Sequence, residues 1–119
     1  MLAKVTDGSP VLVVDDDAVS RHVLVSALAR AGLPSVALSS GQAALDWLES
    51  NTPSVVLLDL VMPPPDGYDI LRVLRGRDAT KSVPAVVLTA LDADEEIERA
   101  FAEGADDFLR KPFRPAELV

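Results

Sequence analysis

Cysteine is absent from the 119 residues of the sequence, and histidine occurs once. Without cysteine the chain has no disulfide bond, thiolate nucleophile or cysteine-ligated metal, and one histidine excludes a multi-histidine metal site. No apolar run approaches the roughly 18–20 residues that a membrane span needs, and residues 1–8 contain no signal-peptide hydrophobic segment. We therefore expect a cytoplasmic protein without a membrane partner.

Basic residues are also scarce, at 11 Lys and Arg against 19 Asp and Glu, which gives a net charge of −8. Nucleic-acid binders neutralise phosphates with Lys and Arg, so we expect no direct nucleic-acid partner. Hydrophobic residues make up 49% and charged residues 25%, which is typical of a globular domain with its own core. We expect one domain over residues 10–119, after a disordered lead-in at residues 1–9.

Three short apolar runs are typical of strands buried on both faces of a sheet, because they are apolar at consecutive positions and rich in β-branched residues. They span 11–14, 55–58 and 83–88. Two weaker strands are predicted at 35–39, where apolar residues alternate, and at 107–110.

Apolar residues at helical spacing fill the segments between these strands. Asp17 is expected to begin the first helix, where negative charge is favoured, and Asp66 to cap the third. Ser39 and Gln42 have capping-box spacing before the second helix. The four stripes lie within 23–31, 44–48, 70–74 and 97–101, and a fifth helix is predicted from Pro115. Strands alternating with helices require a parallel sheet covered on both faces, which is an α/β fold.

Polar residues directly follow the predicted strands, namely Asp15, Asp16, Asp59, Thr89 and Lys111. Ligands of such sheets bind beyond the carboxyl ends of the strands, so we expect these side chains to converge at one edge. Crowded carboxylates repel one another, and Mg²⁺ suits such oxygen ligands. Lysine and hydroxyl donors nearby suit phosphoryl oxygens. A central carboxylate such as Asp59 can act as a nucleophile and form an aspartyl phosphate.

These motifs resemble the receiver domain of bacterial two-component response regulators. The matching segments keep the family's order and span nearly the whole chain. They are 13–17, 57–63, 66–67, 88–90, 104–108 and 111–113. The resemblance implies a flavodoxin-like (βα)5 fold, a three-layer sandwich around a parallel five-stranded sheet of order 2-1-3-4-5.

The resemblance also implies which residues bind metal and phosphate. Asp59 matches the phosphoacceptor. Asp16 and Asp59 match the side-chain ligands of Mg²⁺, Asp15 holds the ion partly through water, and the backbone carbonyl of Val61 matches the remaining protein ligand.

Three further residues match parts of the family's switch. Thr89 matches the hydroxyl that turns inward to the phosphoryl group, and Lys111 matches the ion-pairing lysine. Phe108 matches the aromatic rotamer switch, although it lacks the hydroxyl of a tyrosine. The resemblance further implies a cis peptide bond between Lys111 and Pro112.

The implied function is a phosphorylation switch. A sensor histidine kinase or phosphotransfer protein would phosphorylate Asp59 and change the partners of the surface around the fourth helix. Such a domain is a signalling module rather than an enzyme, although it catalyses its own phosphorylation and dephosphorylation. A phosphorylation-independent interaction module is the alternative, which the intact site residues disfavour. A hydrolase with an Asp nucleophile is also disfavoured, because it would carry a second Asp where Val61 stands.

The sequence departs from the family's usual pattern in places. Three prolines at 63–65 stiffen the loop after Asp59. Val61 and Leu91 occupy positions that influence, in the family, how fast the phosphoryl group is hydrolysed. Both are apolar here and offer no side chain to orient a water, so we expect a long-lived phosphorylated state. The fifth helix reaches Val119 after about one turn, which is too short to be stable alone. We therefore expect the natural protein to continue into a C-terminal output or kinase module, and the uncovered apolar surface to favour a homodimer.

Overall fold

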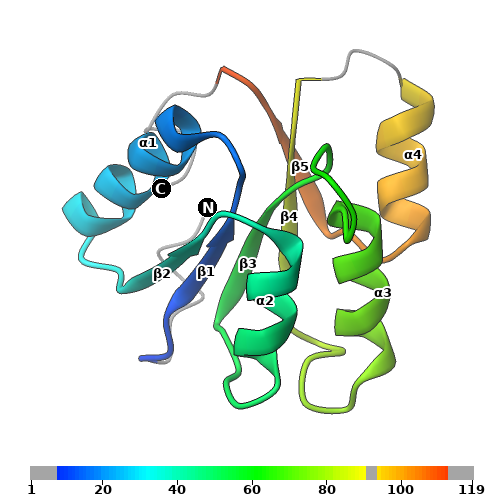
Figure 1. Cartoon of the computed structure of the whole chain (residues 1–119), viewed down its shortest axis with the longest axis horizontal. Helices are drawn as coiled ribbons and strands as arrows, with labels where there is room; N and C mark the ends of the chain where they lie inside the picture. Colours follow the sequence, from blue (N-terminus) through cyan, green and yellow to red (C-terminus); the bar gives the residue numbers. More distant parts are fainter. Residues whose placement is uncertain (1–7, 91–93, 113–119) are drawn as a thin grey trace.

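The computed structural model of the chain describes residues 8–90 and 94–112. Its centre is a five-stranded parallel sheet in the order β2-β1-β3-β4-β5. This is the predicted order, and Figure 1 shows the sheet twisting between its helices. The strands are β1 (Val11–Val14), β2 (Ser35–Leu38), β3 (Val55–Asp59), β4 (Ala85–Thr89) and β5 (Asp107–Arg110).

Four helices cover the sheet in the described part of the chain. They are α1 (Ala18–Arg30), α2 (Gly41–Leu48), α3 (Gly67–Gly76) and α4 (Asp94–Ala102). Alternate residues of the strands belong to two separate cores. In β1, Val11 and Val13 pack with α1, whereas Leu12 and Val14 pack with α2, α3 and α4 on the opposite face (Figure 1). The prediction of strands buried on both faces of a three-layer sandwich is confirmed.

Four predicted strand ends are wrong by one or two residues, one of them in β2, which ends at Leu38 and not at residue 39. The run 83–88 is a strand only from Ala85, and it extends to Thr89. Pro84 has no N–H to donate, and its carbonyl accepts the N–H of Val56 at 2.9 Å just before the paired register begins. β3 likewise continues through Asp59, which pairs with Leu88 of β4. Two of the predicted site residues, Asp59 and Thr89, are thus the last residues of strands rather than the first residues after them.

Side-chain caps fix the starts of three helices. Asp17 and Asp66 are the N-caps of α1 and α3, as predicted, and Asp66 forms a capping box with Asp69. The prediction of a capping box from Ser39 is wrong, because Ser40 caps α2 and its Oγ accepts the N–H of Ala43 at 3.1 Å. α2 therefore begins at Gly41, one residue later than the predicted spacing implies.

The apolar stripe of α4 is narrower than predicted. Ile97 and Ala100 are buried, but Phe101 is 43% exposed. Phe101 instead lies edge-on to Phe108 of β5, with ring centroids 6.2 Å apart. Position 101 is one residue beyond Ala100, and at 100° per residue this turns its side chain away from the sheet.

Several predictions fall on residues 1–7, 91–93 and 113–119, which lie outside the described residues. They concern the lead-in, Leu91 and the fifth helix. Within the described ranges, no helix has the length and apolar character needed to cross a bilayer.

Candidate functional site

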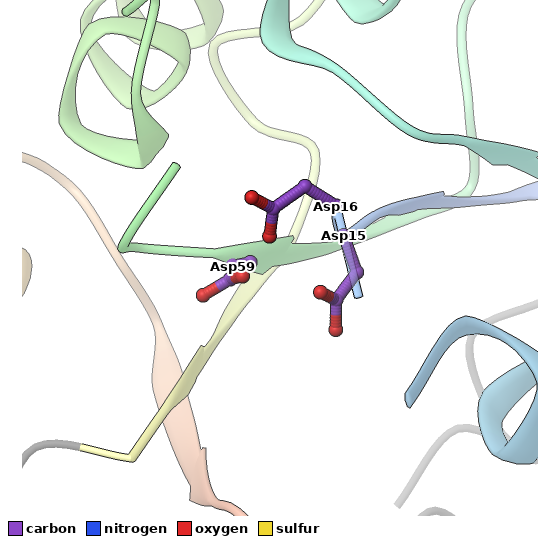
Figure 2. A group of neighbouring side chains, drawn as sticks. All are labelled: Asp15, Asp16 and Asp59. Carbon is purple, nitrogen blue, oxygen red and sulfur yellow. The ribbon is translucent and has the colours of Figure 1, made fainter. Parts of the chain in front are cut away.

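The carboxyl ends of β1 and β3 bring three carboxylates together. These neighbouring strands pair with Val14 opposite Leu58, so the residues that follow, Asp15 and Asp59, emerge side by side. Asp16 joins them from the loop after β1, as Figure 2 shows. One oxygen from each of the three side chains lies within 4.8 Å of the others. Asp15 and Asp59 are buried, whereas Asp16 is exposed to solvent.

Asp15 is held in place by the start of α1. Its Oδ1 accepts the N–H of Asp17 at 2.9 Å, and its backbone carbonyl accepts a hydrogen bond of 2.9 Å from the guanidinium of Arg21. Sequence reasoning missed Arg21, whose only local signal is its place one helical turn after the N-cap Asp17. The other carboxylate oxygen of Asp15, Oδ2, is buried and forms an ion pair with the ammonium group of Lys111.

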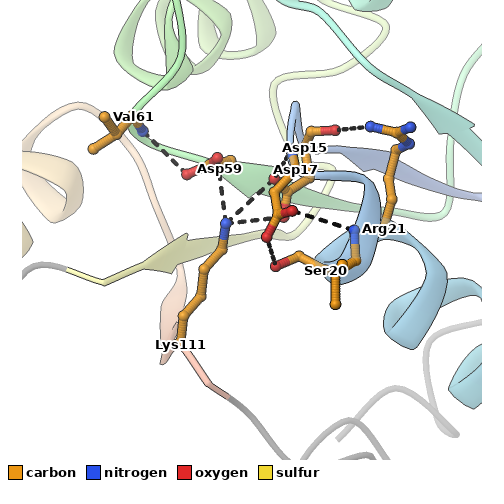
Figure 3. Close-up of polar contacts among 8 residues, drawn as sticks. Asp15, Asp17, Ser20, Arg21, Asp59, Val61 and Lys111 are labelled. Atoms are coloured by element: carbon orange, nitrogen blue, oxygen red, sulfur yellow. Dashed lines mark hydrogen bonds and ion pairs between the residues drawn. The ribbon is translucent and has the colours of Figure 1, made fainter.

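Lys111 reaches both buried carboxylates from the end of β5 (Figure 3). Its Nζ lies 3.0 Å from Oδ2 of Asp15 and 3.4 Å from Oδ2 of Asp59. Burial by itself would lower the pKa of the ammonium, but the hydrogen bond to Asp15 and the charge of Asp59 raise that pKa above its usual value. The predicted cis peptide bond between Lys111 and Pro112 is present.

The acidity of Asp59 is strongly perturbed. Desolvation raises the pKa of its carboxyl group to about 7, and the negative charge of Asp15 acts in the same direction. Lys111 and the N–H of Val61 oppose that rise. A carboxylate that is costly to ionise without a cation beside it is a favourable place for a divalent ion or a phosphoryl group with its counterion.

The loop at residues 60–66 contributes a backbone donor to the site. The N–H of Val61 donates to Oδ1 of Asp59 at 3.1 Å, while the Val61 side chain is 60% exposed. At Gly67, which begins α3, a Cβ atom would lie 2.5 Å from the carbonyl oxygen of Asp59 and 2.7 Å from Cα of Leu60. Only glycine allows α3 to begin so close to the end of β3.

Thr89 and Phe108 lie on the two neighbouring strands beyond β3. Thr89 is fully buried at the end of β4, and its carbonyl accepts the N–H of Lys111 at 2.8 Å. Phe108 is half-buried against the core under α4, with the guanidinium of Arg110 over its ring at 5.5 Å. The structure therefore brings Asp15, Asp16, Asp59, the Val61 backbone, Thr89 and Lys111 to one edge of the sheet, with Phe108 farther along β5.

Residues 11–119 match the family model of the response regulator receiver domain. The chain belongs to this family. The receiver domain is 40% identical over 109 residues to the DNA-binding response regulator MtrA of Mycobacterium tuberculosis (strain ATCC 25618 / H37Rv), covering 92% of this chain and 46% of that protein. It is 37% identical over 109 residues to the two-component response regulator ORR7 of Oryza sativa subsp. japonica, covering 91% and 52%. The chain thus spans about half the length of these curated relatives.

Solved structures of receiver domains share the fold. The receiver domain of the Francisella response regulator 1452 is 32% identical, with a TM-score of 0.84 over 93% of this chain and 90% of that chain. The receiver domain of the sensor histidine kinase PA1611 from Pseudomonas aeruginosa PAO1 is 31% identical, with a TM-score of 0.85 over 93% and 91%. That structure holds a magnesium ion in its active site cleft. The flavodoxin-like fold predicted for this receiver domain is confirmed.

Proposed function

We propose that this receiver domain accepts a phosphoryl group on Asp59 in a reaction that depends on Mg²⁺. The observation that carries the proposal is the convergence on Asp59 of two more carboxylates and one ammonium group. Oxygens of Asp15, Asp16 and Asp59 lie within 4.8 Å of one another, and Nζ of Lys111 lies 3.4 Å from Asp59. Phosphoryl transfer needs little more from a protein than alignment and charge neutralisation, and these groups supply both.

The residues at this edge fit a magnesium ion. Mg²⁺ is bound by carboxylate, carbonyl and water oxygens, and three carboxylates cluster here around the single ammonium group of Lys111. Asp16 and Asp59 would bind the ion directly, Asp15 partly through water, and Val61 through its backbone carbonyl. When bound, the ion neutralises negative charge on the carboxylates and on the phosphoryl oxygens.

The chain's own residues orient Asp59 to attack the phosphorus atom of the donor. One carboxylate oxygen forms a bond to phosphorus while the bond from phosphorus to the donor's imidazole nitrogen breaks, and its electron pair returns to that nitrogen. The N–H of Val61 fixes the orientation of the carboxylate through its 3.1 Å hydrogen bond to Oδ1. Lys111 can donate to the phosphoryl oxygens as charge passes onto them.

The switch follows from the added charge. The phosphoryl group on Asp59 would attract the hydroxyl of Thr89. Phe108 would then move into the space that the Thr89 side chain vacates. Because Phe108 contacts Phe101 of α4, this movement would change the surface formed by α4 and β5. Charge-driven rearrangement of a packed element is the usual physical basis of a phosphorylation switch.

The proposal extends to the donor and the whole protein. The donor is a sensor histidine kinase or a phosphotransfer protein, and both act in the cytoplasm. Residues 10–119 form the receiver part, and an output module follows it in the full-length protein. A DNA-binding output, such as the name of MtrA indicates for that relative, would have to supply its own basic surface, because this domain carries a net charge of −8.

The test is phosphorylation by acetyl phosphate, followed by intact-mass measurement with and without Mg²⁺. We expect one phosphoryl group on the wild-type protein with Mg²⁺, and none on Asp59→Asn or after chelation. Asp17→Asn is the matched control, because asparagine also caps a helix and Asp17 caps α1. Undiminished phosphorylation of Asp59→Asn would refute the assignment.

A further inference from the structure

The N-terminus of α2 contacts the 60–66 loop at an unusually short distance. At Gly41 a Cβ atom would lie 2.0 Å from the carbonyl oxygen of Pro65 and 3.1 Å from its Cγ. Real Cβ atoms essentially never approach another heavy atom within 3.0 Å, so any other residue would push the two segments apart by about 1 Å. Gly41 does not have a positive φ, so close approach alone is the reason for glycine here.

α2 cannot retreat freely from this contact. Its first turn is held by Ser40, whose Oγ accepts the N–H of Ala43. Ala44 and Leu48 then fix the helix in the core shared with β1 and β3. A larger residue at position 41 would therefore displace the loop rather than the helix.

The 60–66 loop cannot absorb the displacement locally. Its prolines at 63–65 each have a fixed φ, and Met62 is buried in the core. At its far end Asp66 is fixed by the capping box of α3, and the N–H of Gly67 donates to the carbonyl of Leu60 at 3.4 Å. A push on Pro65 is therefore transmitted through stiff backbone to the first residues of the loop.

Those first residues contact the acceptor directly. Val61 donates its N–H to Oδ1 of Asp59, and its carbonyl is the backbone ligand in the proposed metal site. The contact also lies beside the site, because Asp16, Gly41 and Pro65 line one cavity of about 150 Å³.

We infer that Gly41 is a positioning residue for the metal site: its missing side chain lets α2 pack against Pro65 and so holds the Val61 backbone at Asp59. The inference rests on the proposed function, since it assigns Gly41 a part in the same Mg²⁺ site. It adds Gly41, the first residue of α2, which is not one of the residues that would bind the metal or the phosphoryl group.

The test compares Gly41→Ala with Gly76→Ala. Gly76 is at the end of α3, where an added Cβ would meet nothing within 4 Å. Mg²⁺ affinity is measured by titration calorimetry, the amide resonance of Val61 by NMR without Mg²⁺, and stability by urea unfolding. We expect Gly41→Ala to bind Mg²⁺ at least about fivefold more weakly and to shift the Val61 amide, while Gly76→Ala matches the wild type.

A Gly41→Ala protein that loses stability yet keeps wild-type Mg²⁺ affinity and an unchanged Val61 amide would overturn the inference. If Gly41→Ala does not fold, Pro65→Gly takes its place, because it adds no side-chain atom at the contact and removes both the fixed φ of the loop and the ring carbon Cγ that faces Gly41. Weaker Mg²⁺ binding by Pro65→Gly supports the inference, and wild-type binding overturns it. A wild-type protein that binds no Mg²⁺ would instead contradict the proposed function.

Discussion

Nζ of Lys111 lies 3.0 Å from Oδ2 of Asp15, although the two residues are 96 positions apart and β3 and β4 separate their strands in the sheet. The lysine ammonium therefore occupies the negative edge of the sheet as an internal cation. Without it, two buried carboxylates would face each other with little compensation, which is costly in a low-dielectric setting. A divalent ion would relieve the same repulsion, so the ammonium and the ion act on one charge cluster.

Replacing Lys111 should separate the effect of its ammonium group from the effect of a divalent ion on the same carboxylates. We expect Lys111→Met to lower the free energy of unfolding without metal by about 1–3 kcal/mol, because the buried carboxylates of Asp15 and Asp59 lose their donor. We also expect Mg²⁺ to raise the melting temperature of Lys111→Met by more than that of the wild type, because no ammonium competes for the carboxylates. Lys81→Met is the control, since its ammonium is on the surface, 3.5 Å from an exposed Asp78. Equal Mg²⁺-dependent shifts in all three proteins would contradict this account.

Asp59 should make the metal-free protein less stable as the pH rises. Its pKa is raised from 3.8 to about 7 in the folded protein, so the folded state binds more protons than the unfolded state between these values. The free energy of unfolding contributed by this group is therefore present at low pH and falls as the pH rises from about 4 to about 7. Asparagine stays neutral, so Asp59→Asn should be more stable than the wild type at pH 8 by up to about 4 kcal/mol. Chemical denaturation at pH 4.5 and pH 8 measures the difference, which should nearly vanish at the lower pH. A gain that does not change with pH would mean that ionisation of Asp59 is not its cause.

Val61 should prolong the phosphorylated state that we propose. Hydrolysis requires a water in line with phosphorus, and an apolar side chain at the rim of the site cannot orient one by hydrogen bonding. We expect Val61→Asn to shorten the lifetime of phosphorylated Asp59 several-fold, as measured by release of inorganic phosphate. Val19→Asn is the control, because Val19 is also exposed, at 71% against 60% for Val61. A short wild-type lifetime that Val61→Asn leaves unchanged would count against the prediction.

Arg75 should contribute strongly to the stability of the half of the domain around α3 and β4. Its partly buried guanidinium links the end of α3 to two distant segments. It donates to the carbonyls of Thr80, Lys81, Val83 and Gly104, and to the carboxylate of Asp106. We expect Arg75→Met to lower the free energy of unfolding by about 2–4 kcal/mol, because these acceptors lose their donor. Urea unfolding measures the loss, and Arg77→Met, at an exposed position, should change stability by less than about 0.5 kcal/mol. Similar losses in the two variants would show that the network around Arg75 adds little.

Much of the fold was predictable because the decisive signals are short in range. Buried parallel strands are apolar at consecutive positions, and this pattern located β1 and β3 to within one residue. An N-cap depends on a side chain and a backbone N–H only two or three positions away, so Asp17 and Asp66 could be identified locally. The strand order was implied by the resemblance and is confirmed by the pairing of the strands.

Local sequence was a poorer guide where distant segments compete. Pro84 reads as part of an apolar run, but the register with Val56 starts β4 one residue later. Phe101 fits a helical stripe, but Phe108 offers it a partner outside the core. Either serine before α2 could serve as a cap, and the structure selects Ser40.

In the candidate site, too, some features could be predicted from the sequence and others could not. The residue types at the strand ends, and the expectation that they meet at one edge, follow from the sequence, because parallel strands all present their carboxyl ends on the same side. The strong rise in the pKa of Asp59 and the double contact of Lys111 depend on how deeply the edge is buried. The support of Asp15 by Arg21 and the approach of Gly41 to Pro65 depend on where two helices begin in space. Only the packed structure decides these features, because distances and desolvation arise between segments that the sequence keeps far apart.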